Sequence, residues 1–168
     1  MSIEQKIAAI FGMSNEVWMR HANPWSVWTR YAALPVLLFS IWSRMWIGWW
    51  STIPIILSAF WIWINPRVFK KPRSTKNWAS KAVLGERVWL NRKEVAVPDH
   101  FEPVIKVLSA ISGVGTLICI WGLIILSFWM TIFGMVLLIL GKSWFLDRMV
   151  WLYDEMKDVH QEYGKWFY

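Results

Sequence analysis

The sequence predicts an all-α polytopic membrane protein, with four transmembrane helices arranged as two helical hairpins. Residues 107–141 contain no charged side chain, whereas one membrane-spanning helix needs only ~20 apolar residues. This run is therefore too long for one span, and it fits two spans joined by a very short turn. A second apolar block, residues 31–64, is interrupted only by Arg44 and again has room for two spans. With 57% hydrophobic residues, the chain is predicted to form a single membrane domain over residues 1–168.

The first half of the chain is expected to contain a surface segment and two spans. Residues 1–22 are predicted to form an amphipathic segment in the membrane interface, because apolar side chains recur at helical spacing among charged ones. The first span is expected over residues 25–43, with Pro24 suited to the first helical turn. The second span is expected over residues 48–64, since Pro66 disfavours a helical conformation in the residue before it.

The central loop, residues 66–103, is basic at its start and mixed in charge later. Ser74 is expected to cap a short helix that stops at Gly85. Residues 86–94 are ambiguous between a strand and a second helix. The loop contains tryptophans, so we expect it to fold as a cap on the membrane surface and not as a floppy linker.

The second half is expected to contain a third span at residues 104–126, a fourth at 128–145 and an amphipathic helix at 146–168. The amphipathic helix is predicted from a stripe of apolar residues that recur every three or four positions. These residues are Phe145, Met149, Leu152, Met156, Val159, Tyr163 and Trp166. The stripe must be covered, either by the central loop or by the same helix of another copy.

The third span carries small side chains at three- and four-residue spacing. They are Ser109, Ser112, Gly113, Thr116 and Cys119. Small residues on one face allow helices to approach closely, which favours a tight seam with a neighbouring helix. A narrow polar path is the alternative.

The distribution of positive charge predicts the orientation. Of 18 Lys and Arg residues, only Arg44 falls in either of the two tight turns between paired spans. The positive-inside rule then places both termini and the central loop in the cytoplasm. Most of the 16 tryptophans are explained by an aromatic belt at the headgroup boundary of a cell (inner) membrane.

No catalytic pattern stands out in the sequence. It lacks a phosphate-binding glycine loop, a paired-histidine helix motif and a nucleophile elbow. No acidic residue lies inside a predicted span, which argues against an ion-coupled transporter. The histidines, at positions 21, 100 and 160, lack the spacing of metal-binding motifs. We therefore expect no metal and no cofactor.

The polar side chains that could act together lie at the predicted cytoplasmic boundary. We select eight of them as candidate ligand- or headgroup-binding residues and refer to them as the polar ring. They are His21, Arg30, Arg87, Asn91, Arg92, Asp147, Arg148 and Asp154. The arginines could hold an anionic group bidentately while the aspartates orient them. A structural ion-pair network, lipid headgroup recognition and an interfacial enzyme with a histidine base all remain open.

Three segments carry a resemblance to a known family. Residues 21–30 (HANPWSVWTR), 65–67 (NPR) and 84–92 (LGERVWLNR) resemble a family of small bacterial and archaeal membrane proteins without an assigned function. The likeness covers roughly the first 100 residues and implies no activity, cofactor or catalytic residue. It implies a prokaryotic cell membrane and a small stand-alone protein.

These observations predict a non-enzymatic protein that acts by association, as a homo-oligomer or as an accessory subunit of a membrane complex. The alternative is an interfacial enzyme or lipid-binding protein that uses the polar ring, and a third possibility is an oligomeric channel. The expected partners are membrane lipids and either a second copy or another membrane protein. We expect no nucleic acid partner.

Overall fold

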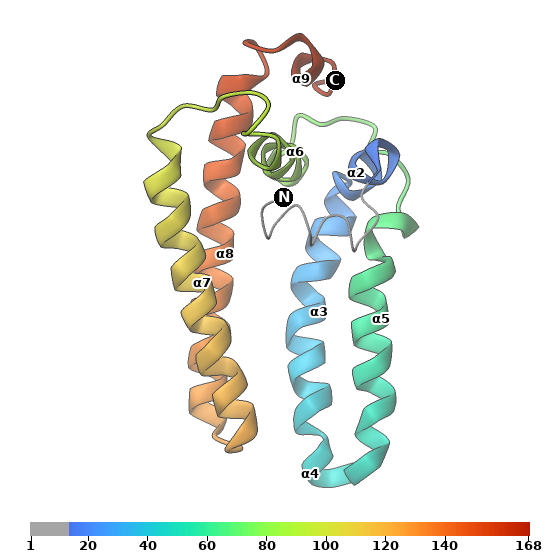
Figure 1. The fold of residues 1–168 in the computed structure, drawn as a ribbon. Coiled ribbons are helices and arrows are strands. Elements are labelled where there is room, and N and C mark those ends of the chain that lie inside the picture. The colour runs from blue at the N-terminus through green and yellow to red at the C-terminus, as the bar shows by residue number, and fades with distance from the viewer. Residues whose placement is uncertain (1–13) are drawn as a thin grey trace. The chain divides into compact units, whose positions relative to one another are not determined.

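The computed structural model describes residues 14–168, and these residues form helices and no strands (Figure 1). In chain order the elements are α2 (Asn15–His21), α3 (Pro24–Trp42), α4 (Arg44–Ile47), the 3₁₀ helix η1 (Gly48–Ser51), α5 (Thr52–Val68), α6 (Trp78–Leu90), α7 (Phe101–Ile124), α8 (Phe128–Met156) and α9 (Gln161–Gly164). The predicted surface segment at residues 1–22 is described only from Ser14 onward. Its first part lies outside the described residues.

Three helical segments within residues 14–168 are long and apolar enough to cross a membrane. They are Pro24–Val68, which contains α3, α4, η1 and α5, and the single helices Phe101–Ile124 and Phe128–Met156. The prediction of an all-helical chain with membrane-spanning helices is confirmed to this extent.

The chain divides into two compact units, which we describe separately. The apolar unit comprises Tyr31–Ile62 and Glu102–Phe145. The polar unit comprises the described residues up to Arg30, together with Trp63–Phe101 and Leu146–Tyr168.

The apolar unit is held together by a small core and by close contacts between helix backbones. Leu38 of α3 is buried with Cys119 and Leu123 of α7. The Arg44 guanidinium donates a hydrogen bond to the Leu123 carbonyl, so the only basic residue of the first apolar block is bonded within this unit. Gly48 follows at φ +55°, a backbone conformation that favours glycine, where α4 passes into η1.

Glycines form the contact between α7 and α8. A Cβ at Gly115 would lie 2.5 Å from the Leu138 nitrogen, and one at Gly134 would lie 2.3 Å from the Cys119 nitrogen. Near the end of α7, a Cβ at Gly122 would meet the Thr131 nitrogen at 2.6 Å. Small residues therefore let the two backbones approach closely, as expected where helices pack without a hydrophobic driving force.

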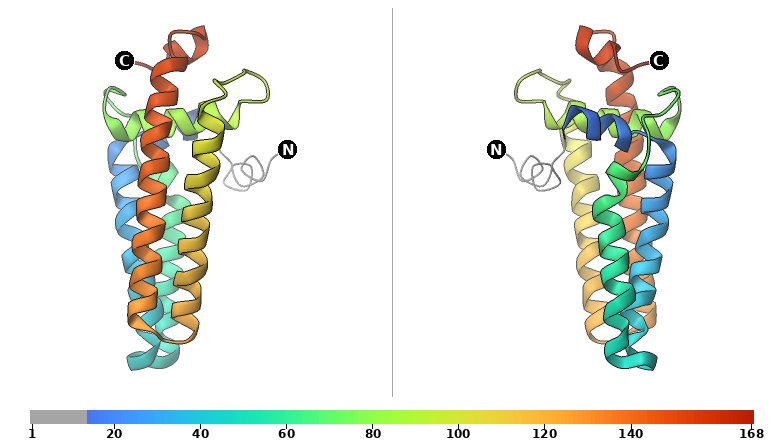
Figure 2. Two further views of the ribbon diagram at one scale, coloured as in Figure 1. Left: turned by 90° about the vertical axis from the view of Figure 1, so that its left-hand side faces the viewer. Right: turned by 90° about the vertical axis from the view of Figure 1, so that its right-hand side faces the viewer.

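The polar unit is organised by α6 packing on the C-terminal part of α8. Figure 2 shows α6 lying crosswise to α8. A Cβ at Gly85 would lie 1.9 Å from the Met149 carbonyl oxygen, so the two backbones are in direct contact here. Ser80 donates a 2.6 Å hydrogen bond to the Ala22 carbonyl and connects α6 to the end of α2.

The central loop corrects the helix boundaries that we predicted. The helix begins after Asn77, whose side chain accepts a 2.9 Å hydrogen bond from the Ser80 amide, and not after Ser74. It also continues through Gly85 to Leu90, because Gly85 is required for packing on α8 and is not a stop signal. Within the ambiguous segment 86–94, residues 86–90 are therefore part of this helix and residues 91–94 form a turn, so neither a strand nor a separate second helix forms.

Two other boundaries differ from the prediction. Helix α5 continues past Pro66 to Val68, where the Arg67 Nη1 atom donates to the Trp63 carbonyl and satisfies an acceptor near the helix end. The predicted fourth span and the first part of the predicted tail helix form one continuous helix, α8, which ends at Met156.

The tail stripe is covered by its own chain. Met149, Leu152, Met156 and Tyr163 are buried within the polar unit, which includes the central loop. Val159, however, is 76% exposed, because the chain leaves the helix between α8 and α9 and the seven-residue register is lost.

Candidate functional site

A buried hydrogen-bond chain joins three helices of the polar unit. His21 ends α2, Ser26 and Thr29 lie in the first turns of α3, and Asn65 lies near the end of α5. The Ser26 hydroxyl is 3.0 Å from His21 Nδ1 and donates to Asn65 Oδ1 at 2.7 Å. The Asn65 amide donates to Thr29 Oγ1 at 2.8 Å. Ser26 and Asn65 are completely buried, so each needs these partners to offset its desolvation.

Arg30 fixes the donor and acceptor roles in this series of hydrogen bonds. Its Nη1 atom lies 2.5 Å from His21 Nε2, and a guanidinium can only donate. His21 Nε2 is therefore the acceptor, and Nδ1 carries the proton that is donated to Ser26. Glu86 of α6 interacts electrostatically with Arg30 and partly compensates its charge.

This direction determines the chemistry that is possible at Ser26. Its proton is donated to Asn65, and its lone pair accepts from His21. A serine nucleophile would instead donate its proton to the histidine. The arrangement is thus a hydrogen-bond lock between α2, α3 and α5, and it gives no support to a serine–histidine catalytic pair.

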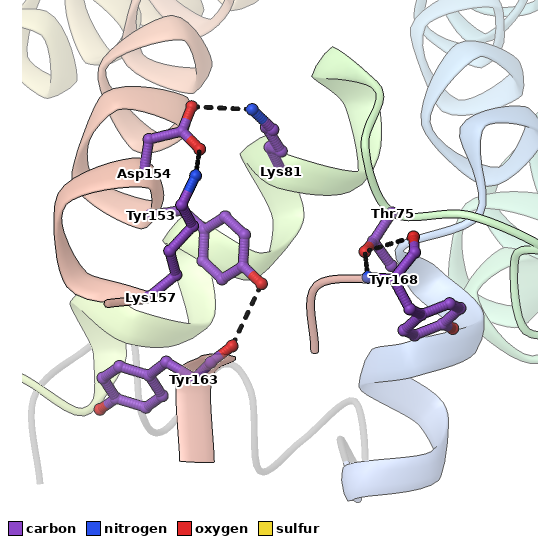
Figure 3. Close-up of polar contacts among 7 residues, drawn as sticks. All are labelled: Thr75, Lys81, Tyr153, Asp154, Lys157, Tyr163 and Tyr168. Atoms are coloured by element: carbon purple, nitrogen blue, oxygen red, sulfur yellow. Dashed lines mark hydrogen bonds and ion pairs between the residues drawn. The ribbon is translucent and has the colours of Figure 1, made fainter. Parts of the chain in front are cut away.

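Lysines, and not the predicted arginines, form the ion pairs of Asp154. Its carboxylate lies 2.9 Å from Lys81 Nζ of α6 and 2.8 Å from Lys157 Nζ. Figure 3 shows the carboxylate between the two ammonium groups. Nearby, the Tyr153 hydroxyl donates a 3.2 Å hydrogen bond to the Tyr163 carbonyl, which attaches the end of the chain to α8.

Arg87 of α6 and Arg92, which follows the helix, lie against aromatic rings. The Arg87 guanidinium is 3.9 Å from the centre of the Trp166 ring and is hydrogen-bonded to Asn15 of α2. Burial lowers the pKa of Arg87, and the nearby Glu162 carboxylate opposes that shift. Arg92 lies 4.3 Å from the Trp89 ring centre. These contacts are typical of cation–π packing.

The remaining polar-ring residues make local contacts. The Asn91 side chain donates to the Tyr163 hydroxyl at 3.0 Å. The Asp147 carboxylate accepts from Trp78 Nε1 at 3.2 Å and from Arg148 Nη2 at 2.9 Å. The Arg148 guanidinium also lies 3.8 Å from the Trp151 ring centre.

All eight residues of the polar ring belong to the polar unit, where they form separate local contacts. His21 contacts Arg30, and Asp147 contacts Arg148, but Arg87, Asn91, Arg92 and Asp154 each have other partners. Among residues 14–168, no three His, Cys, Asp or Glu side chains are grouped so that they could hold a metal ion.

The sequence-based selection missed several residues that organise the unit. They are Ser26, Thr29, Asn65, Lys81, Lys157 and Trp166. Asn65 had a detectable signal, because it is an amide at the end of a long apolar block. Lys81 and Lys157 had none, since lysines are common both in a basic loop and on the polar face of an amphipathic helix.

Residues 14–168 thus form an all-helical fold with three helical segments long and apolar enough to cross a membrane. The chain belongs to a family of unknown function, DUF6653, which it matches over residues 2–164. The predicted resemblance is confirmed as far as membership of a family of unknown function. No curated protein and no solved structure matches the chain.

Proposed function

We propose that this is a small integral membrane protein of a prokaryotic cell (inner) membrane that crosses the bilayer four times, as two hairpins. The segment Pro24–Val68 has 45 residues, roughly 68 Å as one straight helix, whereas the hydrocarbon core is about 30 Å thick. Helices α3 and α5 have 19 and 17 residues, each close to the length of one span. The distribution of Lys and Arg favours cytoplasmic termini and a cytoplasmic segment between α5 and α7.

Reporter fusions test this topology. Fusions at both termini and within residues 70–93 are expected to read cytoplasmic, because the basic residues resist translocation. Fusions at Arg44 and Ser127, in the two short turns, are expected to read external. A cytoplasmic signal at Arg44 would contradict the four-span count and the charge argument together.

We further propose that the protein acts by association, as a homo-oligomer or as an accessory subunit of a membrane complex. One observation carries this proposal. Ser109, Gly113 and Leu117, spaced four residues apart on α7, form a face that we call the open face, and all three are exposed. A Cβ at Gly113 would meet nothing within 4 Å. By contrast, two other members of the predicted seam, Ser112 and Cys119, lie against Gly141 and Gly134 of α8. Among the described residues, α8 therefore covers one side of the predicted seam and leaves the open face uncovered.

A lipid-facing surface of a single membrane helix has no need of small residues, whereas a surface that meets a second helix does. Small residues four positions apart are typical of surfaces where a second helix approaches closely. The tail stripe no longer supports association, because four of its seven residues, Met149, Leu152, Met156 and Tyr163, are buried within the polar unit. The open face is therefore the one observation on which the proposal of association rests.

Filling the open face tests the proposal. Gly113→Leu is expected to weaken self-association about tenfold or more, ~1.4 kcal/mol, because the side chain keeps a second helix at a distance. The measurement is energy transfer between labelled copies in phosphatidylcholine vesicles, across a range of protein-to-lipid ratios. Val114→Leu is the matched control, since Val114 is also exposed but lies on another face of α7.

Equal association of the two variants would contradict a role for the open face in self-association. Wild-type protein that gives no energy transfer and that purifies from native membranes without another membrane protein would contradict association altogether.

A further inference from the structure

A short basic segment connects the end of α5 to α6. Residues 67–76, which we call the basic strap, contain five positive residues and no acidic one. The positive residues are Arg67, Lys70, Lys71, Arg73 and Lys76. The last four of these are exposed.

The backbone of the strap is held at several points. Asn23, at the start of α3, donates a 2.9 Å hydrogen bond to the Lys70 carbonyl. Thr75 is fully buried; its amide donates to the Tyr168 carbonyl at 2.9 Å, and its hydroxyl donates to the Trp166 carbonyl at 2.7 Å. Figure 3 shows Thr75 beside Tyr168. The strap therefore presents its side chains from a fixed backbone.

Unlike Lys81 and Lys157, the four exposed strap cations have no acidic partner among residues 14–168. Elsewhere in the polar unit, Lys81 and Lys157 share the carboxylate of Asp154. Lys71 lies 5.0 Å from the Tyr168 ring centre, but a ring contact leaves the positive charge uncancelled. The four exposed strap cations are therefore available to an anion from outside the described chain.

The position of the strap in the chain indicates which anion it meets. It begins at the end of an apolar, membrane-capable segment, and α5 ends only two residues before Lys70. Trp63 and Val68, near the end of α5, are exposed as expected beside lipid. Four to eight basic residues next to a spanning helix are typical of attraction to anionic lipids.

We propose that the basic strap binds the phosphate groups of anionic phospholipids. In the membrane, the proposed topology would place the strap at the cytoplasmic leaflet. Phospholipid binding in a detergent micelle does not depend on that topology. Failure of the topology or of self-association is therefore distinguishable from failure of this inference.

The test compares two double variants of the full chain with equal net charge. Lys70→Gln with Arg73→Gln removes two exposed strap cations. Lys93→Gln with Lys106→Gln removes two exposed cations on either side of the α7 N-terminus. Each purified protein, in neutral detergent, is mixed with phosphatidylglycerol or phosphatidylcholine, and bound lipid is counted by native mass spectrometry.

We expect the wild-type protein and the control variant to retain phosphatidylglycerol in preference to phosphatidylcholine. The strap variant is expected to bind phosphatidylglycerol roughly 30-fold more weakly, from about 1 kcal/mol per basic residue near a lipid surface. A third double variant, Lys70→Arg with Arg73→Lys, conserves the charge of the strap and is expected to keep the preference. It distinguishes the loss of positive charge from a loss of folding.

Three outcomes would overturn the inference. The wild-type protein could show no preference, both double variants could weaken equally, or the charge-conserving variant could lose binding. Inorganic phosphate is added as a competing probe, and full displacement of phosphatidylglycerol at millimolar phosphate would show a soluble-anion site instead of a lipid site.

Discussion

Replacing Gly85 with alanine is expected to destabilise the protein by about 3 kcal/mol, at the upper end of the usual cost of overpacking. The new Cβ would lie 1.9 Å from the Met149 carbonyl oxygen and 2.5 Å from the carbonyl carbon. Both atoms belong to the α8 backbone and cannot turn aside as a flexible side chain would. Helix α6 must therefore move away from α8, which opens the core of the polar unit.

The measurement is unfolding in a mild detergent, followed by the helical circular dichroism signal. Gly113→Ala is the matched control, at a protein concentration at which the wild-type protein is monomeric, because Gly113 is also helical and its Cβ would meet no described atom within 4 Å. There alanine is expected to be neutral or to stabilise by up to ~1 kcal/mol, through its better helix propensity. If both variants melt alike, the close contact between α6 and α8 is absent in solution.

Gly85 also illustrates what the sequence could not predict. Local rules read a glycine after Leu84 as the end of a helix. The structure places it in the middle of α6, where the missing side chain makes room for α8. That requirement comes from a contact with Met149, more than 60 positions away, and no local pattern records it. Ser74 is engaged in a long-range contact too, because its hydroxyl donates a 2.9 Å hydrogen bond to the Tyr168 carbonyl, and Asn77 caps α6 instead.

The apolar helices were easier to predict, because an uncharged run of this length is itself the signal. The number of spans depends on the turn near Gly48, and their orientation depends on the distribution of Lys and Arg along the chain. Both stay predictions. The polar ring stays a prediction as a binding site. All its members lie in the polar unit, but their partners, such as Lys81 for Asp154, depend on long-range contacts.

Replacing Leu152 with aspartate is expected to unfold the polar unit. Leu152 has no exposed surface. Truncating a buried leucine typically costs ~2–5 kcal/mol, and burying an unpaired carboxylate adds several more. This sum is comparable to the ~5–15 kcal/mol total stability of a typical folded protein. The variant is therefore expected to aggregate in size-exclusion chromatography and to lose the cooperative melting of the wild-type protein.

Val159→Asp is the control, because the sequence pattern and the structure predict different results for it. The seven-residue stripe places Leu152 and Val159 on one buried face, so the pattern alone predicts that aspartate is equally harmful at both positions. In the structure Val159 is 76% exposed, between the end of α8 and the start of α9. A carboxylate there stays hydrated, and surface substitutions of this kind usually change stability by no more than about 0.5 kcal/mol. Val159→Asp should therefore elute and melt like the wild-type protein, whereas aggregation of this variant would mean that α8 continues past Met156 and buries the whole stripe.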